Sequence, residues 1–280
     1  MPGLSGATRL AAVIGDPARH SLSPAIHNAA FAACDLDWTY LAFDVPEGRA
    51  VAALDAMRTF GLGGLSVTMP HKTAVAAAVD TRSEAADRLE AVNCVVPTEQ
   101  GLHGENTDGD GFIAGLGADA GIEPNDVDAL VIGGGGAARA VVEALARHGA
   151  ASVAVHNRSP QRAEGAARLA GERGRTVGLA ELDQYTLIVN ATPIGMVGVG
   201  DRDAVPCPVD SLGAHQVLID LVYEPARTEW LRQADARGVE GHNGLSMLVH
   251  QAAAAFTLWT GVPAPIGAMT QAASTALAAR

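Results

Sequence analysis

Residues 128–149 read DALVIGGGGAARAVVEALARHG, and this stretch decides the fold class. A short apolar run, typical of a buried strand, leads straight into a glycine-rich turn and then into a segment with helical periodicity. Gly133, Gly135 and Ala138 fit the pattern G-x-G-x-x-A, which gives a tight turn, close approach of a ligand to the backbone, and close packing of helix on strand. The free N–H groups of the helix N-terminus attract anions. The pattern predicts a turn that binds a dinucleotide pyrophosphate; the alternative is a glycine-rich loop without a ligand.

The residues after the next predicted strand indicate which dinucleotide binds. Sites for NAD usually place an acid there to accept a hydrogen bond from the ribose 2′-hydroxyl, but residues 152–162 contain no acid. They offer Asn157, Arg158, Ser159 and Arg162 instead. Because a guanidinium binds a phosphate through two parallel hydrogen bonds, the pattern favours NADP over NAD. The alternative is that these arginines are solvated residues at the start of a helix.

The same alternation of strand-like and helix-like segments runs through the chain. It is typical of an α/β fold in which parallel strands are buried on both faces. The turn-rich residues 105–127 predict a domain boundary, and a second series of strands begins at Asp128. The segment from Gly244 onward is helical and could pack on either half. The predicted buried parallel strands are LAAVIG (10–15), WTYLAFDV (38–45), GGLSVTMP (63–70), ALVIGGGG (129–136), SVAVHN (152–157), TLIVNATP (186–193) and QVLIDLVY (216–223).

Composition narrows the choice of partners and compartment. The 280 residues are 48% hydrophobic, enough for a sizeable core, and carry a formal net charge of −12. This charge argues against nucleic acids and anionic membranes, both of which favour a basic surface. The cysteines, Cys34, Cys94 and Cys207, form no CxxC pair, so we expect no metal site and no disulfide framework. With no signal peptide and no long apolar run, the sequence predicts a cytoplasmic protein.

Polar clusters follow several predicted strands and turns. Each has an ordinary structural explanation when taken alone. Ser23 before Pro24 is typical of a helix N-cap, and a single lysine after a turn, such as Lys72, is usually solvated. The clusters are GDPARHSLSPAIHN (15–28), GLSVTMPHK (64–72), AVNC (91–94), GENTDGDG (104–111) and GLSMLVHQ (244–251).

Taken in order, these clusters resemble the motifs of shikimate dehydrogenases. The glycine-rich turn, NRS (157–159), NATPIGM (190–196) and DLVYEP (220–225) complete the series, which runs from Gly15 to Gln251. The chain is similar to the NADP-using, shikimate-selective branch more than to the quinate/shikimate branch, which tends to use NAD. The two serines of HSLSP and the acid-free NRS stretch both point to the NADP-using branch.

The resemblance implies two α/β domains. An N-terminal substrate domain would comprise residues 1–108 and 244–280, so that the C-terminal helices return to it. A Rossmann-type, doubly wound NADP domain would comprise residues 109–243. The reaction implied is the reversible, NADPH-dependent reduction of 3-dehydroshikimate to shikimate, a step of chorismate and aromatic amino acid biosynthesis. The expected state is a monomer or a homodimer.

The resemblance also implies roles for the matching residues. Lys72 would be the acid/base residue, with Asp108 beside it. The residues implied to bind the substrate are Ser21, Ser23, Ser66, Thr68, Asn93, Asp108, Tyr223 and Gln251. Those implied to bind the cofactor are Gly133, Gly134, Gly135, Gly136, Ala137, Asn157, Arg158, Ser159, Arg162, Thr192, Leu221 and Gly244.

Two positions depart from the family pattern, and other activities stay open. Ser66 stands where asparagine is more common, so a shorter hydroxyl replaces an amide in the proposed substrate site, and Cys94 stands where threonine is usual. One alternative is an NAD-linked quinate/shikimate dehydrogenase or a homologue acting on a relative of shikimate. A dinucleotide-binding regulator without catalytic activity is another, but it would have no need of the Lys72 and Asp108 pair.

Overall fold

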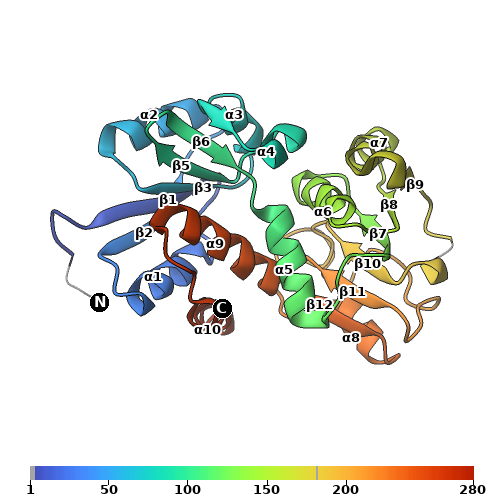
Figure 1. The fold of residues 1–280 in the computed structure, drawn as a ribbon. Coiled ribbons are helices and arrows are strands. Elements are labelled where there is room, and N and C mark those ends of the chain that lie inside the picture. Colours follow the sequence, from blue (N-terminus) through green and yellow to red (C-terminus); the bar gives the residue numbers. More distant parts are fainter. Residues whose placement is uncertain (1–3, 181) are drawn as a thin grey trace. The chain divides into compact units, whose positions relative to one another are not determined.

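A computed structural model describes residues 4–180 and 182–280 of the chain (Figure 1). Its internal contacts divide the chain into two compact units. Unit 1 is Met1–Thr107 together with Val249–Arg280, and unit 2 is Asp108–Leu248. Asp108 and residues 244–248, expected in the substrate domain, therefore belong to unit 2.

Unit 2 contains a parallel sheet of six strands in the order β12-β11-β10-β7-β8-β9. This is the doubly wound arrangement predicted from the sequence. The order reverses between β7 and β10, and ligands of such sheets bind where the order reverses. The strands are β7 (Asp128–Ile132), β8 (Ser152–His156), β9 (Gly174–Thr176), β10 (Leu187–Asn190), β11 (Val217–Asp220) and β12 (Glu240–Asn243).

Apolar residues cover both faces of this sheet, as a parallel sheet requires. Along β7, Ala129 and Val131 belong to one core cluster, while Leu130 and Ile132 belong to the other, because successive side chains point to opposite faces. The first cluster includes residues from α5 (Asp108–Ala120), α6 (Gly136–Arg147) and α7 (Pro160–Ala167), which is followed by the 3-10 turn η1 (Arg168–Arg173). The second includes residues from the 3-10 turn η2 (Leu182–Gln184) and from α8 (Glu229–Asp235).

Unit 1 contains a mixed sheet, in the order β2-β1-β3-β5-β6-β4. β5 runs antiparallel to both β3 and β6, so the prediction of parallel strands throughout is wrong for this unit. The β5–β6 hairpin lacks a continuous apolar run and contains Pro97, which explains why periodicity did not reveal it. The strands are β1 (Arg9–Gly15), β2 (Trp38–Asp44), β3 (Gly64–Val67), β4 (Thr81–Arg82), β5 (Cys94–Thr98) and β6 (Gly101–Glu105).

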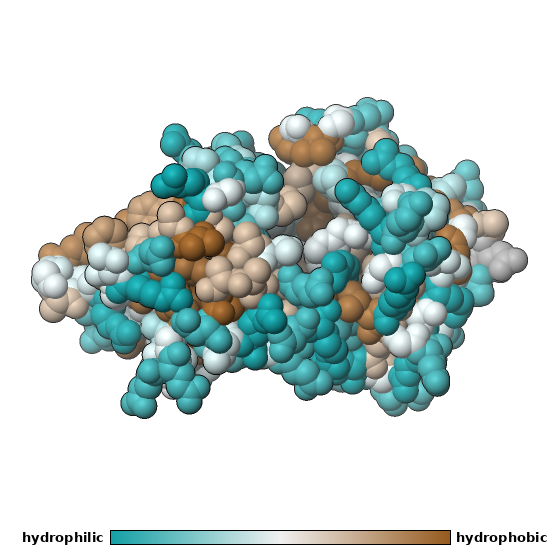
Figure 2. Space-filling model, turned by 90° about the horizontal axis from the view of Figure 1, so that it is seen from above, coloured by the Kyte–Doolittle hydropathy of each residue, from teal (hydrophilic) through white to brown (hydrophobic). Residues whose placement is uncertain are grey.

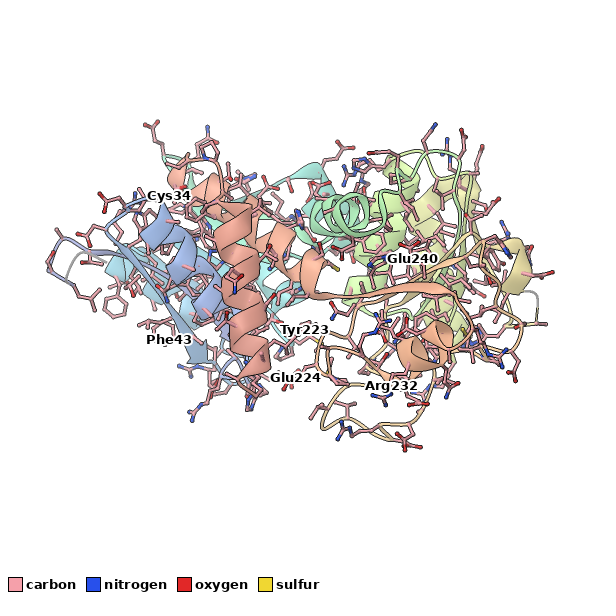
Figure 3. The ribbon with its side chains drawn as sticks, turned by 90° about the horizontal axis from the view of Figure 1, so that it is seen from below. Cys34, Phe43, Tyr223, Glu224, Arg232 and Glu240 are labelled. Atoms are coloured by element: carbon pink, nitrogen blue, oxygen red, sulfur yellow. The ribbon has the colours of Figure 1, made fainter. Side chains whose placement is uncertain are left out.

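The sequence predicts a buried strand at β2, but β2 is an edge strand that buries only one face. Tyr40 is fully buried, whereas Leu41 and Phe43 are 46% and 41% exposed, because side chains alternate between the two faces. Phe43 is labelled in Figure 3. The surface seen in Figure 2 likewise carries apolar residues scattered among polar ones. Among the described residues, no helix has both the length and the apolar character needed to cross a membrane.

Helices close both faces of the unit 1 sheet. Buried residues of α2 (Ala50–Phe60), α3 (Lys72–Ala76) and α4 (Glu84–Leu89) form a core cluster with β1, β3 and β5. On the other face, α1 (Ser23–Ala33) packs against α10 (Ile266–Ala278). α9 (Leu245–Thr260) places Trp259 against the sheet, where the indole Nε1 donates a hydrogen bond to the Val95 carbonyl at 3.1 Å. The C-terminal helices thus pack on the N-terminal sheet.

The contact between Trp259 and Gly64 leads to a stability prediction. A Cβ atom at Gly64 would lie 2.3 Å from Cδ2 of the Trp259 ring, so β3 can approach α9 only through a glycine. We expect Gly64→Ala to lower the free energy of unfolding by about 1–3 kcal/mol, the usual cost of overpacking. Chemical denaturation followed by circular dichroism measures the effect.

Gly267→Ala is the matched control for this experiment. Gly267 lies in α10 of the same unit, and a Cβ there would meet nothing within 4 Å. Alanine in a helix is favoured over glycine, so this change should leave stability equal or slightly higher. Equal stability of both variants would contradict the packing role assigned to Trp259.

Candidate active site

The turn between β7 and α6 has the geometry that the fingerprint requires. Gly133 has φ +136°, a conformation that favours glycine, and its N–H donates to the His156 carbonyl at 2.8 Å. A Cβ at Gly133 would lie 2.8 Å from the carbonyl oxygen of Ala191, directly after β10. The buried Ala138 packs in the first core cluster, so it keeps the helix close to the strand.

The same turn leaves room for a ligand at the N-terminus of α6. Gly135 and Gly136 are exposed, and Cβ atoms built there would meet nothing within 4 Å. Gly135 is the N-cap residue and provides no side-chain cap. The N–H groups of the first turn have no partner within the helix, so this opening suits the phosphates of a dinucleotide. Gly134 and Ala137 belong to the same turn and first helical residues.

The residues after β8 lie next to this turn. A Cβ at Gly134 would come within 2.9 Å of the Arg162 Cβ, so the two segments are in close contact. Asn157 donates through Nδ2 to the Ser159 carbonyl at 3.2 Å, and the Ser159 hydroxyl caps α7 by accepting from the Arg162 N–H. The side chains of Arg158 and Arg162 are exposed. These groups fit a 2′-phosphate, which two guanidinium groups can neutralise.

The segments after β10 and β11 bring together the other predicted cofactor residues of unit 2. The Asn190 side chain accepts from the N–H and the hydroxyl of Thr192 at 3.0 and 2.6 Å. A Cβ at Gly244 would overlap the Leu221 carbonyl oxygen, at 2.2 Å, so these two residues are adjacent and position 244 requires glycine. Tyr223, labelled in Figure 3, follows β11 and is half-buried.

In unit 1, Ser21 and Ser23 form a pair at the start of α1. The Ser21 hydroxyl donates to the Ser23 hydroxyl at 3.0 Å and accepts from the Ser23 N–H at 3.1 Å. The expectation that Ser23 is the N-cap is wrong, because Leu22 is the N-cap and Ser23 is the first helical residue. The Ser23 hydroxyl is therefore directed to its neighbour Ser21 and not to a helix N–H.

A further hydroxyl near this pair was missed by sequence reasoning. Burial raises the pKa of Tyr40, and the neighbouring hydroxyls of Ser66 and Ser23 partly oppose that rise. The Tyr40 hydroxyl is buried, and among the described residues no hydrogen bond to it has favourable geometry. Its ring stacks on His27 at 4.4 Å. An aromatic residue in a strand is typical of core packing, so nothing in the sequence pattern indicated that its hydroxyl lies near Ser66.

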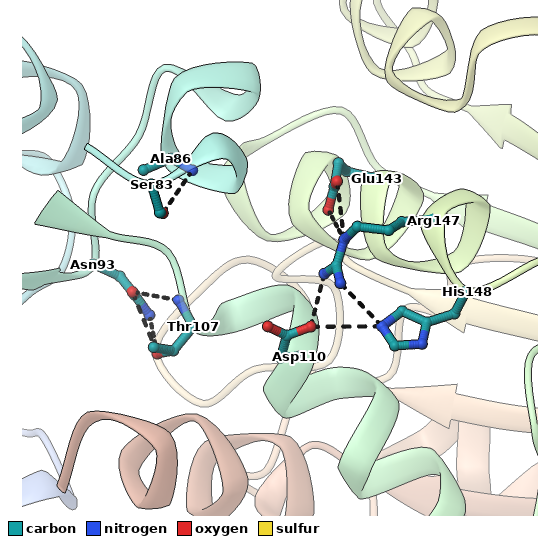
Figure 4. Close-up of polar contacts among 8 residues, drawn as sticks. All are labelled: Ser83, Ala86, Asn93, Thr107, Asp110, Glu143, Arg147 and His148. Atoms are coloured by element: carbon teal, nitrogen blue, oxygen red, sulfur yellow. Dashed lines mark hydrogen bonds and ion pairs between the residues drawn. The ribbon is translucent and has the colours of Figure 1, made fainter. Parts of the chain in front are cut away.

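Asn93, one of the predicted substrate residues of unit 1, is fixed through both its main chain and its side chain, and Figure 4 shows the side-chain bonds. Its carbonyl accepts from the Val67 N–H at 2.8 Å, and its N–H donates to the Glu105 carbonyl at 3.0 Å. Its Oδ1 atom accepts from the Thr107 N–H at 2.8 Å, and its Nδ2 atom donates to the Thr107 hydroxyl at 3.0 Å. Thr107 also donates to the Gln251 carbonyl at 3.1 Å. These bonds hold Asn93 and Gln251 in one network.

Lys72 is the half-buried first residue of α3, next to this network. Its carbonyl accepts from the Val92 N–H at 3.0 Å, so its backbone is fixed beside the residue that precedes Asn93. The preceding residue, His71, is buried and makes a 2.7 Å hydrogen bond to the Val45 carbonyl. A lone lysine after a turn is usually a solvated surface residue, but the backbone that flanks Lys72 is held at several points.

Thr68 and Asp108 complete the predicted set. Thr68 follows β3, where its N–H donates to the Ile14 carbonyl at 2.9 Å. Asp108 is buried and begins α5 in unit 2, immediately after the Thr107 that bonds Asn93. The structure therefore groups the predicted substrate residues Ser21, Ser23, Ser66, Thr68, Asn93 and Gln251 with Lys72 in unit 1, and it places Asp108 and Tyr223 in unit 2.

Comparison with known proteins gives a consistent answer. Residues 13–95 match the shikimate dehydrogenase substrate-binding domain, residues 119–203 match the shikimate/quinate 5-dehydrogenase model, and residues 244–273 match the shikimate 5′-dehydrogenase C-terminal domain. A shikimate dehydrogenase (NADP⁺) of Moorella thermoacetica is 42% identical over 276 residues, which cover 95% of this chain and 92% of that protein.

Solved structures agree with the sequence matches. The Thermus thermophilus shikimate 5-dehydrogenase, in complex with NADP(H) and shikimate, is 40% identical with a TM-score of 0.89, over 96% of this chain and 100% of that one. A Corynebacterium glutamicum quinate dehydrogenase in complex with NAD is 32% identical with a TM-score of 0.87, over 96% and 99% of the two chains. On this evidence the chain belongs to the shikimate dehydrogenase family.

Proposed function

We propose that this protein is an NADP-dependent shikimate dehydrogenase that reduces 3-dehydroshikimate reversibly to shikimate in the cytoplasm, within chorismate and aromatic amino acid biosynthesis. One observation carries the assignment of its chemistry. Lysine and arginine together number 19, and Lys72 is the only lysine among them. It lies beside the Asn93 network in unit 1, where a family relationship implies the substrate site.

The single lysine is informative because the reaction runs in both directions. When a ketone is reduced, its oxygen gains negative charge and needs a proton; when the alcohol is oxidised, the same proton must be taken back. A guanidinium stays protonated in proteins, whereas an ammonium can release its proton. Every other long cationic side chain of this protein is an arginine, and the single lysine stands at position 72, where the reaction requires proton release.

The residues around Lys72 suit a small hydroxylated acid. NADPH, when bound, supplies the hydride. Ser21 and Ser23 present paired hydroxyls that can bind a carboxylate. The short polar side chains Ser66, Thr68, Asn93 and Gln251 can pair with ring hydroxyls, each of which needs a partner once water is removed. We assign Asp108 to hold the Lys72 ammonium and Tyr223 to contact the substrate.

NADP is the cofactor that the unit 2 residues fit. The open turn at Gly135 and Gly136 accepts the pyrophosphate, and the exposed Arg158 and Arg162 can bind the 2′-phosphate. No acid lies between residues 152 and 162 to bind a free ribose 2′-hydroxyl. The quinate dehydrogenase relative carries NAD, so an NAD-linked quinate/shikimate dehydrogenase is the competing function. A monomer or homodimer is the assembly we propose.

The decisive assay pairs two substrates with two cofactors. Oxidation of shikimate and of quinate is followed at alkaline pH by reduced-nicotinamide absorbance, each with NADP and with NAD. We expect the highest kcat/KM for shikimate with NADP. A higher kcat/KM for quinate with NAD would assign the competing function, and tight NADPH binding without turnover of either substrate would indicate a non-catalytic protein.

Substitution of Lys72 tests its role. We expect Lys72→Ala to lower kcat about 10²- to 10⁴-fold, the usual range for a general acid–base group, with little change in the KM for shikimate. Lys72→Arg should lose activity to a similar extent, because it keeps the charge but not the ability to release a proton. Steady-state kinetics gives both values. The control is Arg58→Lys, the reverse exchange at a surface position of unit 1, and this variant should keep the wild-type kcat. Substantial activity of Lys72→Arg would rule out the proton-transfer role.

The two arginines after β8 test the cofactor assignment. We expect Arg158→Ala together with Arg162→Ala to raise the KM for NADP by roughly 10- to 100-fold, as loss of charge-assisted bonds worth about 1.5–3 kcal/mol predicts. The KM for NAD should stay within about twofold, because NAD has no 2′-phosphate. Initial rates with both cofactors measure the shift. Equal losses with NADP and NAD would show that the arginines do not read the 2′-phosphate.

A further inference from the structure

A buried carboxylate lies at the end of β11, directly before Leu221, one of the residues implied to bind the cofactor. Asp220 is fully buried and accepts three hydrogen bonds. Its Oδ1 atom accepts from Asn190 Nδ2 at 2.8 Å and from the Val222 N–H at 3.1 Å. Its Oδ2 atom accepts from the Thr228 hydroxyl at 2.7 Å. One side chain therefore connects three separate segments of unit 2.

Each partner of Asp220 controls a segment near the carboxyl edge of the sheet. Asn190 holds the segment after β10, since its Oδ1 atom accepts from Thr192 and its Nδ2 atom also donates to the Ile194 carbonyl at 3.3 Å. Val222 lies between Leu221 and Tyr223 in the segment after β11. The third partner, Thr228, is the N-cap residue of α8.

The ionised Asp220 carboxylate lowers the free energy of unfolding at neutral pH relative to acidic pH. Burial raises the pKa of Asp220 from 3.8 to about 6, and only the three hydrogen-bond donors, none of them charged, oppose this rise. The folded chain therefore binds the proton more tightly than the unfolded chain, so stability falls as pH rises from about 4 to about 6 and stays lower above it. A neutral amide would avoid this cost, so an acid at this position points to a role other than stability.

We propose that Asp220 is a positioning residue of the cofactor site. Its carboxylate fixes the segments after β10 and β11 so that Thr192 and Leu221, both implied to bind the cofactor, are presented to NADP. This inference rests on the proposed function for the identity of the cofactor. Protonation at Oδ2 reverses the bond to Thr228, because the carboxyl O–H then donates to the Thr228 hydroxyl, whose own proton loses Asp220 as its acceptor. The loss of the negative charge also weakens the bonds that Asn190 and Val222 donate to Oδ1.

Direct titration of NADP tests this role without any substrate. Dissociation constants are measured by calorimetry for the wild type and for Asp220→Asn, whose amide has the shape of the protonated carboxyl. At pH 7.5 we expect the variant to bind NADP roughly 3- to 30-fold more weakly, while its thermal midpoint is equal or higher. The ratio of the two constants should approach one as the pH falls below about 6. The 2′-phosphate titrates in the same range, and comparing both proteins at each pH cancels that effect.

Gln216 supplies a matched control at the other end of the same strand. It is fully buried just before β11 and also makes three side-chain hydrogen bonds, to the Leu182 and Tyr185 carbonyls and from the Gly213 N–H. Gln216→Met should lower the thermal midpoint and leave the NADP dissociation constant unchanged. Asn190→Ala removes the other partner of the Asn190–Asp220 hydrogen bond and should weaken NADP binding as Asp220→Asn does. It replaces Asp220→Asn in the experiment if Asp220→Asn does not fold.

The outcomes separate the possible explanations. Wild-type NADP affinity in Asp220→Asn, or equal weakening in Asp220→Asn and Gln216→Met, would overturn the positioning role. A wild type that binds NADP but does not oxidise shikimate would refute the proposed activity and leave the result for Asp220 standing, because the titration involves no turnover.

Discussion

A polar side chain that is removed from water must find hydrogen-bond partners, and this constraint shapes the candidate site of each unit. In unit 1, Asn93 is buried between β3 and β6, with main-chain bonds to Val67 and Glu105 and side-chain bonds to Thr107. In unit 2, Asp220 has three donors from three segments. Because these side chains are satisfied from within, the residues beside them are held in place before any ligand binds.

Preorganisation of this kind is what a reversible dehydrogenase needs. Binding energy spent on ordering a loop is not available for stabilising the transition state. The Asn93 network fixes the backbone next to Lys72, and the Asn190–Asp220 pair fixes Thr192 and Leu221. The acid at position 220 costs stability and the lysine at position 72 stands alone among arginines, so both are best explained by their chemistry and not by packing.

Much of this architecture could be predicted from the sequence, for physical reasons. The strand, glycine turn and helix at residues 128–149 leave few alternatives to a parallel sheet, and apolar runs predict β7, β8, β10 and β11. The short, polar strands β9 and β12 have no such run and were not predicted. The β5–β6 hairpin could not be predicted, since it is short, interrupted by Pro97 and without clear alternation. The exposure of Leu41 and Phe43 could not be predicted either, because an edge strand and a central strand share the same composition.

The candidate site was also only partly predictable from the sequence. The family resemblance indicated which residues form the site, but only the structure shows which hydrogen bonds those residues make. Tyr40 and Asp220 lie inside apolar strand runs, so periodicity assigns them to the core, and only the structure reveals that their polar atoms face Ser66 and Asn190. Ser23 next to Pro24 predicts an N-cap, but its hydroxyl pairs with Ser21, two residues earlier.

Amine-selective acylation tests the central claim most directly, because the chain contains a single lysine. The protein is treated with an acylating reagent with and without shikimate and NADP, and label at Lys72 and at the terminal amino group is measured by mass spectrometry alongside activity. The account predicts that turnover falls in proportion to the label at Lys72. Shikimate and NADP should slow the labelling of Lys72 and the loss of turnover to the same extent. Label at the terminal amino group should have no effect on turnover. Full turnover by a protein completely acylated at Lys72 would contradict it.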